Sequence, residues 1–107
     1  MVRELLSRPE RPTAVFAASD ITAIEVMSCA NELRLKVPRD LSIVGFDDVL
    51  LARTPMIALT TVAQPIAELA RRGIDAAIGL IENPQAPPQI TRIEPQLIVR
   101  KTTAPPR

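Results

Sequence analysis

Short apolar runs and one helical periodicity alternate in the first half of the chain. Residues 41–44 are apolar and β-favouring, which is typical of a strand that a parallel sheet buries on both faces, and residues 13–18 predict another buried strand. Between them, residues 21–35 place one apolar sector at helical spacing, made of Ala23, Val26, Met27, Ala30 and Leu33. Strand, helix and strand in this order predict a right-handed βαβ unit and an α/β fold with a parallel sheet.

The helix predicted for residues 21–35 has a second apolar sector, smaller and partly polar. It lies nearly opposite the first and consists of Ile21, Ile24, Ser28, Asn31 and Leu35. A helix that lies on a sheet needs only one apolar face. The second sector therefore predicts another packed neighbour, and the pattern leaves open whether it belongs to the same domain or to a partner chain.

The second half of the chain has the pattern of a strand, a long helix and a return strand. Residues 59–62 are β-favouring, and residues 65–82 carry an apolar stripe at the spacing of an amphipathic helix. Residues 83–88 are rich in proline and end that helix. Residues 93–99 alternate apolar and polar positions, and Pro95 favours an edge strand. We expect residues 1–8 to be helical, residues 49–58 to connect two strands, and the Pro-rich residues 101–107 to be frayed.

Polar residues follow both strands of the βαβ unit at the point where each strand ends. Ser19 and Asp20 follow the first strand, and Asp47 and Asp48 follow Gly45 and Phe46 after the second. Parallel strands place these residues at one edge of the sheet, where open α/β sheets bind ligands. Ser19 or Asp20 can also cap the next helix. We expect Asp48 to be a turn or cap residue.

Composition excludes several kinds of site. The 107 residues suffice for one small domain, and the two aromatic residues, Phe16 and Phe46, leave the core to aliphatic side chains. The chain has no histidine and one cysteine, Cys29, which excludes His-based catalytic triads, His/Cys metal sites and an internal disulfide. A net charge of +1 with dispersed basic residues predicts no nucleic-acid or anionic membrane surface. No window predicts a membrane span or a signal peptide.

Four segments, in this order, resemble the C-terminal part of the sensor domain of LacI-family transcriptional regulators. They are PTAVFAASD at 12–20, VPRDLSIVGFDD at 37–48, LTTVAQP at 59–65 and LIVRKTT at 97–103. The resemblance implies an incomplete type I periplasmic-binding-protein-like fold, mostly the C-terminal lobe. Residues 1–60 would form that lobe, residues 61–101 the crossover, helix and return strand, and residues 102–107 a tail. The helix over residues 65–82 would cover a first lobe that this chain lacks.

The resemblance also implies a function in effector sensing and dimerisation. Members of the family are cytoplasmic homodimers that bind a small molecule, often a sugar, between two lobes. They contact DNA through a helix-turn-helix domain that is absent here, use no cofactor or metal, and are not enzymes. Ser19 and Asp47 match effector positions, with Ser19 in place of the commoner Asn. Asp20 matches the family's Asp at the helix start and is a third candidate contact, for which an N-cap role is favoured over ligand contact. Ile24, Ser28, Met56 and Ile57 match dimer-interface positions, and Ala58 replaces the usual Pro.

Two other functions compete with this hypothesis. A fragment of a periplasmic-type sugar-binding protein would share the fold, although the segments at 37–40 and 59–62 favour the regulator. A small enzyme could use Asp47 and Asp48 as paired carboxylates. Such chemistry needs two groups on opposite sides of a bond, whereas adjacent turn residues usually point apart. We therefore expect binding and not catalysis.

Overall fold

The computed structural model describes residues 1–106 and divides into two compact units. The sheet unit comprises Met1–Ala63 together with the chain from Gln96 onward, and the helix unit comprises Gln64–Pro95. The helices are α1 (Val2–Leu6), α2 (Asp20–Glu32) and α3 (Ile66–Glu82), with a 3-10 turn η1 (Leu50–Arg53). The strands are β1 (Ala14–Phe16), β2 (Ser42–Asp47), β3 (Thr60–Ala63) and β4 (Gln96–Ile98).

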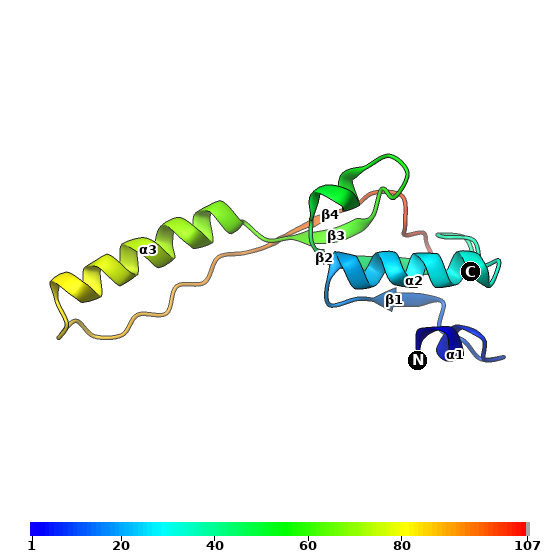
Figure 1. The fold of residues 1–107 in the computed structure, drawn as a ribbon, viewed down its shortest axis with the longest axis horizontal. Coiled ribbons are helices and arrows are strands. Elements are labelled where there is room, and N and C mark those ends of the chain that lie inside the picture. Colours follow the sequence, from blue (N-terminus) through cyan, green and yellow to red (C-terminus); the bar gives the residue numbers. More distant parts are fainter. Residues whose placement is uncertain (107) are drawn as a thin grey trace. The chain divides into compact units, whose positions relative to one another are not determined.

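The four strands form one sheet in the order β1-β2-β3-β4 (Figure 1). The first three are parallel, and β4 returns antiparallel to β3. The predicted strand, helix and parallel strand are confirmed as β1, α2 and β2. The return strand lies at a sheet edge, as Pro95 predicted, and begins directly after that residue.

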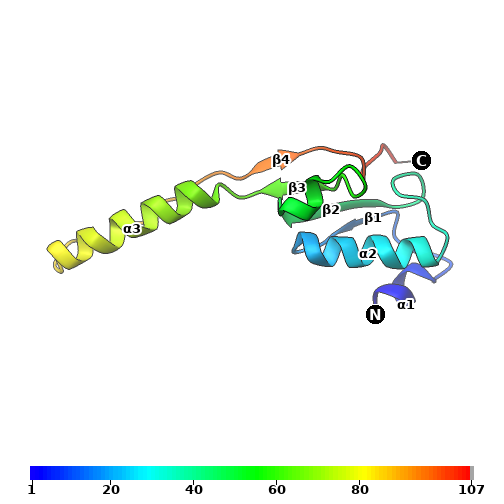
Figure 2. The ribbon, with the colours of Figure 1, turned by 45° about the horizontal axis from the view of Figure 1, so that its top comes forward.

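Helix α2 packs on one face of the sheet through the first apolar sector, and α1 packs on α2 (Figure 2). The core cluster contains no aromatic residue, which confirms an aliphatic core. It consists of Leu6, Ala17, Ala23, Val26, Ala30, Leu41, Ile43, Ala52 and Leu59. The prediction that residues 41–44 are buried on both faces is wrong, and so is the prediction of a buried strand over residues 13–18. Burial alternates along β2, and Phe16 at the end of β1 is 64% exposed, because only the face towards α2 is fully covered.

Helix α2 ends at Glu32, earlier than the predicted residue 35. The amide of Arg34 donates to Asn31 O, the amide of Leu35 donates to Ala30 O, and Arg34 has a φ of 58°. This is a Schellman cap, in which the residue after the C-cap adopts the left-handed conformation. Glycine usually occupies that position, and its absence here hid the end of the helix.

The prediction of a frayed segment from Lys101 is wrong for the residues next to β4. Thr102 is only 2% exposed, and its hydroxyl donates to Ile43 O at 2.6 Å and accepts from Thr60 N at 2.9 Å. Further along, the amide of Ala104 donates to Ser42 Oγ at 3.1 Å. Hydrogen bonds to β2 and β3 therefore fix this segment despite its prolines.

The helix unit consists of α3 and the loop that follows it. The helix begins and ends within one residue of the prediction, and none of its residues is buried. Its apolar side chains, including Ile74, Ile78 and Ile81, are exposed, while Glu68 pairs with Arg71 and Arg72. Among residues 1–106, no helix is both long and apolar enough to cross a membrane.

Candidate functional site

The carboxyl ends of β1, β2 and β3 meet at one edge of the sheet, which we call the carboxyl edge. Phe16 of β1 pairs with Val44 of β2. Ser19 lies as far beyond Phe16 along the chain as Asp47 lies beyond Val44. Both residues therefore lie at the carboxyl edge, as the parallel strands predicted.

Ser19 is the N-cap of α2. Its backbone is extended, and its Oγ accepts a hydrogen bond from Thr22 N at 3.2 Å and donates to Thr22 Oγ1 at 3.1 Å. The capping role that the sequence left open between Ser19 and Asp20 thus belongs to Ser19. The side chain is half-buried and lies at the start of the helix, beside the carboxyl edge.

Asp47 is the last residue of β2 and pairs with Ala63, the last residue of β3. Its φ is 113°, and that of Asp48 is 56°. Non-glycine residues rarely have positive φ, which costs roughly 1–3 kcal/mol per residue and clusters at functional sites. The turn formed by residues 47–49, which we call the 47–49 turn, is therefore held in its shape by its surroundings.

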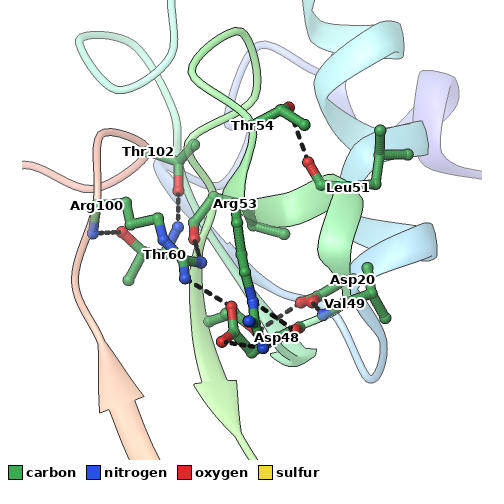
Figure 3. Close-up of polar contacts among 11 residues, drawn as sticks. Asp20, Asp48, Val49, Leu51, Arg53, Thr54, Thr60, Arg100 and Thr102 are labelled. Carbon is green, nitrogen blue, oxygen red and sulfur yellow. Dashed lines mark hydrogen bonds and ion pairs between the residues drawn. The ribbon is translucent and has the colours of Figure 1, made fainter.

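The fully buried carboxylate of Asp20 supports the 47–49 turn from one side. Its Oδ2 accepts from Val49 N at 2.8 Å (Figure 3). Its Oδ1 accepts from Thr61 Oγ1 at 2.5 Å. Asp20 is the first residue of α2, where a negative charge also interacts favourably with the helix dipole. The side chain thus connects α2, the 47–49 turn and β3.

Gly45 makes room for this carboxylate. A Cβ at position 45 would lie 2.3 Å from Asp20 Oδ1 and 2.8 Å from Leu59 Cδ2. Real side chains do not approach so closely, so the buried position of Asp20 requires a residue without a Cβ here. The close approach of the Asp20 carboxylate thus explains why a glycine stands at position 45.

Asp48 holds the other side of the 47–49 turn. Its Oδ1 accepts from Arg100 Nη2 at 2.6 Å, and its Oδ2 lies 3.1 Å from Arg53 Nη2 (Figure 3). Arg53 also donates to the backbone oxygen of Asp48, and Arg100 Nη1 donates to Leu59 O at 2.8 Å. The expectation of a turn residue is confirmed. With both oxygens engaged by guanidinium groups, this carboxylate is placed to hold the turn.

Sequence reasoning missed Arg53, Arg100 and Thr61 as members of this network. Arg100 lies in one of the four segments that carried the resemblance, yet no local spacing connects it with Asp48. Thr61 looked like an ordinary β-favouring residue. The pairing of β3 with β2 brings Thr61 to Asp20, and the path of the chain after β4 brings Arg100 to Asp48.

The residues predicted for a dimer interface lie at two places on the sheet unit. Ile24 is half-buried and Ser28 is exposed, both on α2. Met56 is 96% exposed, whereas the neighbouring Ile57 packs partly against the core cluster. Ala58 has a φ of 43°, which a proline ring cannot adopt, so the Pro expected from the resemblance would not fit this backbone.

Within residues 1–106, no group of three or more His, Cys, Asp or Glu side chains is arranged to hold a metal ion. The polar atoms at the carboxyl edge are hydroxyl, carboxylate and guanidinium groups. Ser19 and Asp47 suit hydrogen bonds to the hydroxyl groups of a small polar ligand.

The chain is similar to bacterial transcription regulators. Residues 1–103 match the family model of the periplasmic binding protein-like domain. Over 103 residues the chain is 39% identical to the HTH-type transcriptional repressor PurR of Escherichia coli O139:H28, covering 96% of this chain and 30% of the repressor. The chain therefore spans less than a third of the length of this relative.

Two solved structures extend the similarity to the fold. A LacI-family transcriptional regulatory protein from Corynebacterium glutamicum has 42% identity and a TM-score of 0.76, with coverage of 97% of this chain and 40% of that one. A LacI family transcriptional regulator from Enterococcus faecalis V583, with bound ribose, has 31% identity and a TM-score of 0.88, with coverage of 99% and 39%. The chain belongs to the periplasmic binding protein-like domain family, in the form found in the sensor domains of LacI-family transcriptional regulators.

Proposed function

We propose that this chain forms part of the effector-binding domain of a transcriptional regulator and contacts a sugar-like effector at its carboxyl edge. The observation that carries the proposal is the 47–49 turn, in which Asp47 keeps a sparsely populated backbone conformation at the end of β2. Strained backbone persists only where the surrounding structure over-determines it, and functional sites collect it. Asp20, Asp48 and two arginines supply that support here.

The chemistry of the edge supports a polyhydroxylated ligand. A carboxylate such as that of Asp47 accepts hydrogen bonds from hydroxyl groups, and the Ser19 hydroxyl can donate and accept. Sugars are bound in several similar structures: ribose in the Enterococcus faecalis regulator, sucrose in a Lactobacillus casei regulator, and cellobiose in CelR. Asp20, the third predicted contact, is fully buried with its two carboxylate oxygens accepting from Val49 and Thr61, so we assign it to holding the 47–49 turn and not to direct contact with the ligand.

The remaining parts of the proposal follow from the similarity to LacI-family regulators. Residues 1–60 would form one lobe, residues 61–101 the crossover, helix and return strand, and residues 102–107 a tail. The regulator would act in the cytoplasm as a homodimer through Ile24, Ser28, Met56 and Ile57, and would contact DNA through a separate domain. The curated relatives are transcriptional repressors, which favours this function over a periplasmic sugar-binding protein and over catalysis.

Isothermal titration calorimetry with ribose, sucrose and cellobiose tests the proposed ligand class. The sample is the native polypeptide that contains this chain. We expect at least one of the three sugars to bind. If none binds, the sugar class is wrong.

Asp47→Ala tests the proposed contact. We expect it to weaken binding of that sugar by about 1.5–3 kcal/mol, the usual cost of losing hydrogen bonds to a charged group. Glu10→Ala, which removes an exposed carboxylate elsewhere in the sheet unit, is the control and should leave the affinity unchanged. Equal affinities of the wild type and Asp47→Ala would exclude Asp47 as a contact.

A further inference from the structure

We infer that Asp20 is a positioning residue that couples the 47–49 turn to strand β3. Its carboxylate joins the two elements directly, because one oxygen accepts from the Val49 amide and the other accepts from the Thr61 hydroxyl. The inference rests on the proposed function only in taking the 47–49 turn as the effector-facing element.

The burial of Asp20 makes this connection stiff. The residue is 0% exposed, so water cannot replace either donor. Gly45 leaves no spare room, since even a Cβ there would overlap Oδ1. A buried carboxylate that lost a donor would be left partly unpaired, and hydrogen bonds to charged groups are about twice as strong as neutral ones. A displacement of Val49 therefore displaces Asp20, and with it Thr61.

A second connection runs in parallel on the other side of the 47–49 turn. Arg100 bonds Asp48 through Nη2 and Leu59 O through Nη1, and its own amide donates to Thr60 Oγ1 at 3.0 Å. Two connections thus fix the turn to the start of β3: Arg100 connects it to Leu59, and Asp20 connects it to Thr61. Arg100 also follows β4 closely in the chain.

These connections reach the two strands that continue into the helix unit, because Thr61 lies in β3 and Arg100 lies two residues after β4. The chain leaves the sheet unit at the end of β3 and returns at the start of β4. A ligand that shifts the 47–49 turn consequently acts on the two strands from which the joining segments extend, and such a connection is the physical requirement for coupling a binding site to a rearrangement elsewhere.

The coupling can be measured without any ligand through the amide signal of Val49 in two-dimensional NMR of the native polypeptide. Thr61→Val is nearly isosteric and removes only the hydroxyl that donates to Asp20. We expect a downfield shift of the Val49 amide proton, because a carboxylate with one donor fewer is a better acceptor for the donor that remains. In an Asp20→Ala background, Thr61→Val should leave the Val49 signal where it is.

Thr60→Val is the matched control, since the Thr60 hydroxyl contacts Thr103 and the Arg100 amide and not Asp20. Its effect on Val49 should be the same with and without Asp20. If Asp20→Ala does not fold, Asp20→Asn takes its place: the amide oxygen still accepts from Val49, and the effect of Thr61→Val should be smaller than in the wild type. An unmoved Val49 signal in Thr61→Val, or equal shifts in both backgrounds, would overturn the inference.

Ribose added to the same samples separates this inference from the proposed function. In the wild type, we expect shifts at both Val49 and Thr61, and in Thr61→Val a shift at Val49 with a smaller response at residues 61–63, because the connection through Arg100 remains. A response at residues 61–63 that is as large in Thr61→Val as in the wild type would overturn the coupling through Asp20. Absence of any ribose response in the wild type would count against ribose as effector, while the ligand-free experiment would still decide the role of Asp20.

Discussion

Gly45 lies against the buried carboxylate of Asp20, and its missing side chain is a testable requirement. We expect Gly45→Ala to lower the free energy of unfolding by about 1–3 kcal/mol, as overpacking of a filled interior does. Gly73→Ala is a matched control in the middle of α3, where an added Cβ meets nothing within 4 Å. It should raise helix stability by about 0.5–1 kcal/mol. In urea unfolding, the two variants should change the free energy of unfolding in opposite directions. An unchanged free energy of unfolding in Gly45→Ala would contradict the close packing.

Thr102 illustrates how one hydroxyl can fix a terminal segment. Thr102→Val keeps the shape of the side chain but leaves the buried Thr60 amide and the Ile43 carbonyl without this partner. We expect a loss of about 1–3 kcal/mol in unfolding free energy. Thr103→Val, at a half-buried neighbour, should cost less. Equal unfolding midpoints for Thr102→Val and the wild type would mean that the segment does not stabilise β2 and β3.

The sequence could predict only those residues of the candidate site whose position follows from the ends of the parallel strands. Ser19 and Asp47 each follow an apolar run, and parallel pairing places both at one edge. The partners of Asp20 and Asp48 could not be predicted in this way. Thr61 and Arg100 are far away in sequence, and their contacts depend on the register of β3 against β2 and on the path of the chain after β4.

At the level of elements, the loop between α2 and β2 has its own electrostatic support. Hydrogen bonds from the Arg39 guanidinium and from the Lys36 amide hold the pKa of Asp40 well below its ordinary value. A carboxyl whose pKa is lower in the folded than in the unfolded state stabilises the fold above the unfolded pKa of about 3.9 and loses that effect as the pH falls towards the folded pKa.

We therefore expect the stability of the wild type to fall more steeply below about pH 4 than that of Asp40→Asn, which cannot be protonated there. The measurement is the thermal midpoint at several pH values between neutral and strongly acidic solution. Glu10→Gln should keep the slope of the wild type. Parallel curves for the wild type and Asp40→Asn would show that the loop does not depend on this charge.

The sequence predicted the positions of the helices and strands better than it predicted which of their residues are buried. Helical spacing identified the face of α2 that packs on the sheet, because that face is determined within a single helix. The apolar run at residues 41–44 suggested cover on both sides, yet Ser42 and Val44 are only half-buried, whereas Leu41 and Ile43 are fully buried. Which face of a strand is covered depends on other elements, and residue types within the strand do not specify it.

At the scale of the whole molecule, the second apolar sector of α2 remains the basis for the proposed homodimer. Ile24 is half-buried within the single chain, so part of its side chain is available to a partner. We expect Ile24→Asp to shift the native polypeptide from dimer towards monomer in analytical ultracentrifugation, because a charge without a partner would be buried at the interface. Thr22→Asp, at an exposed polar position of the same helix, should leave the dimer intact. A dimeric Ile24→Asp variant would move the interface elsewhere.

Ala63 and Gln96 are cross-strand partners, although the whole helix unit lies between them in the chain. From the viewpoint of protein engineering, residues 64–95 are an insertion at the tip of an antiparallel hairpin made of β3 and β4. A two-residue turn such as Asn-Gly is the natural closure of such a hairpin. Because every residue of the core cluster precedes Ala63, excision at this point would leave the core complete. The same junction offers a place where a foreign domain could be grafted into the sheet unit without interrupting a strand.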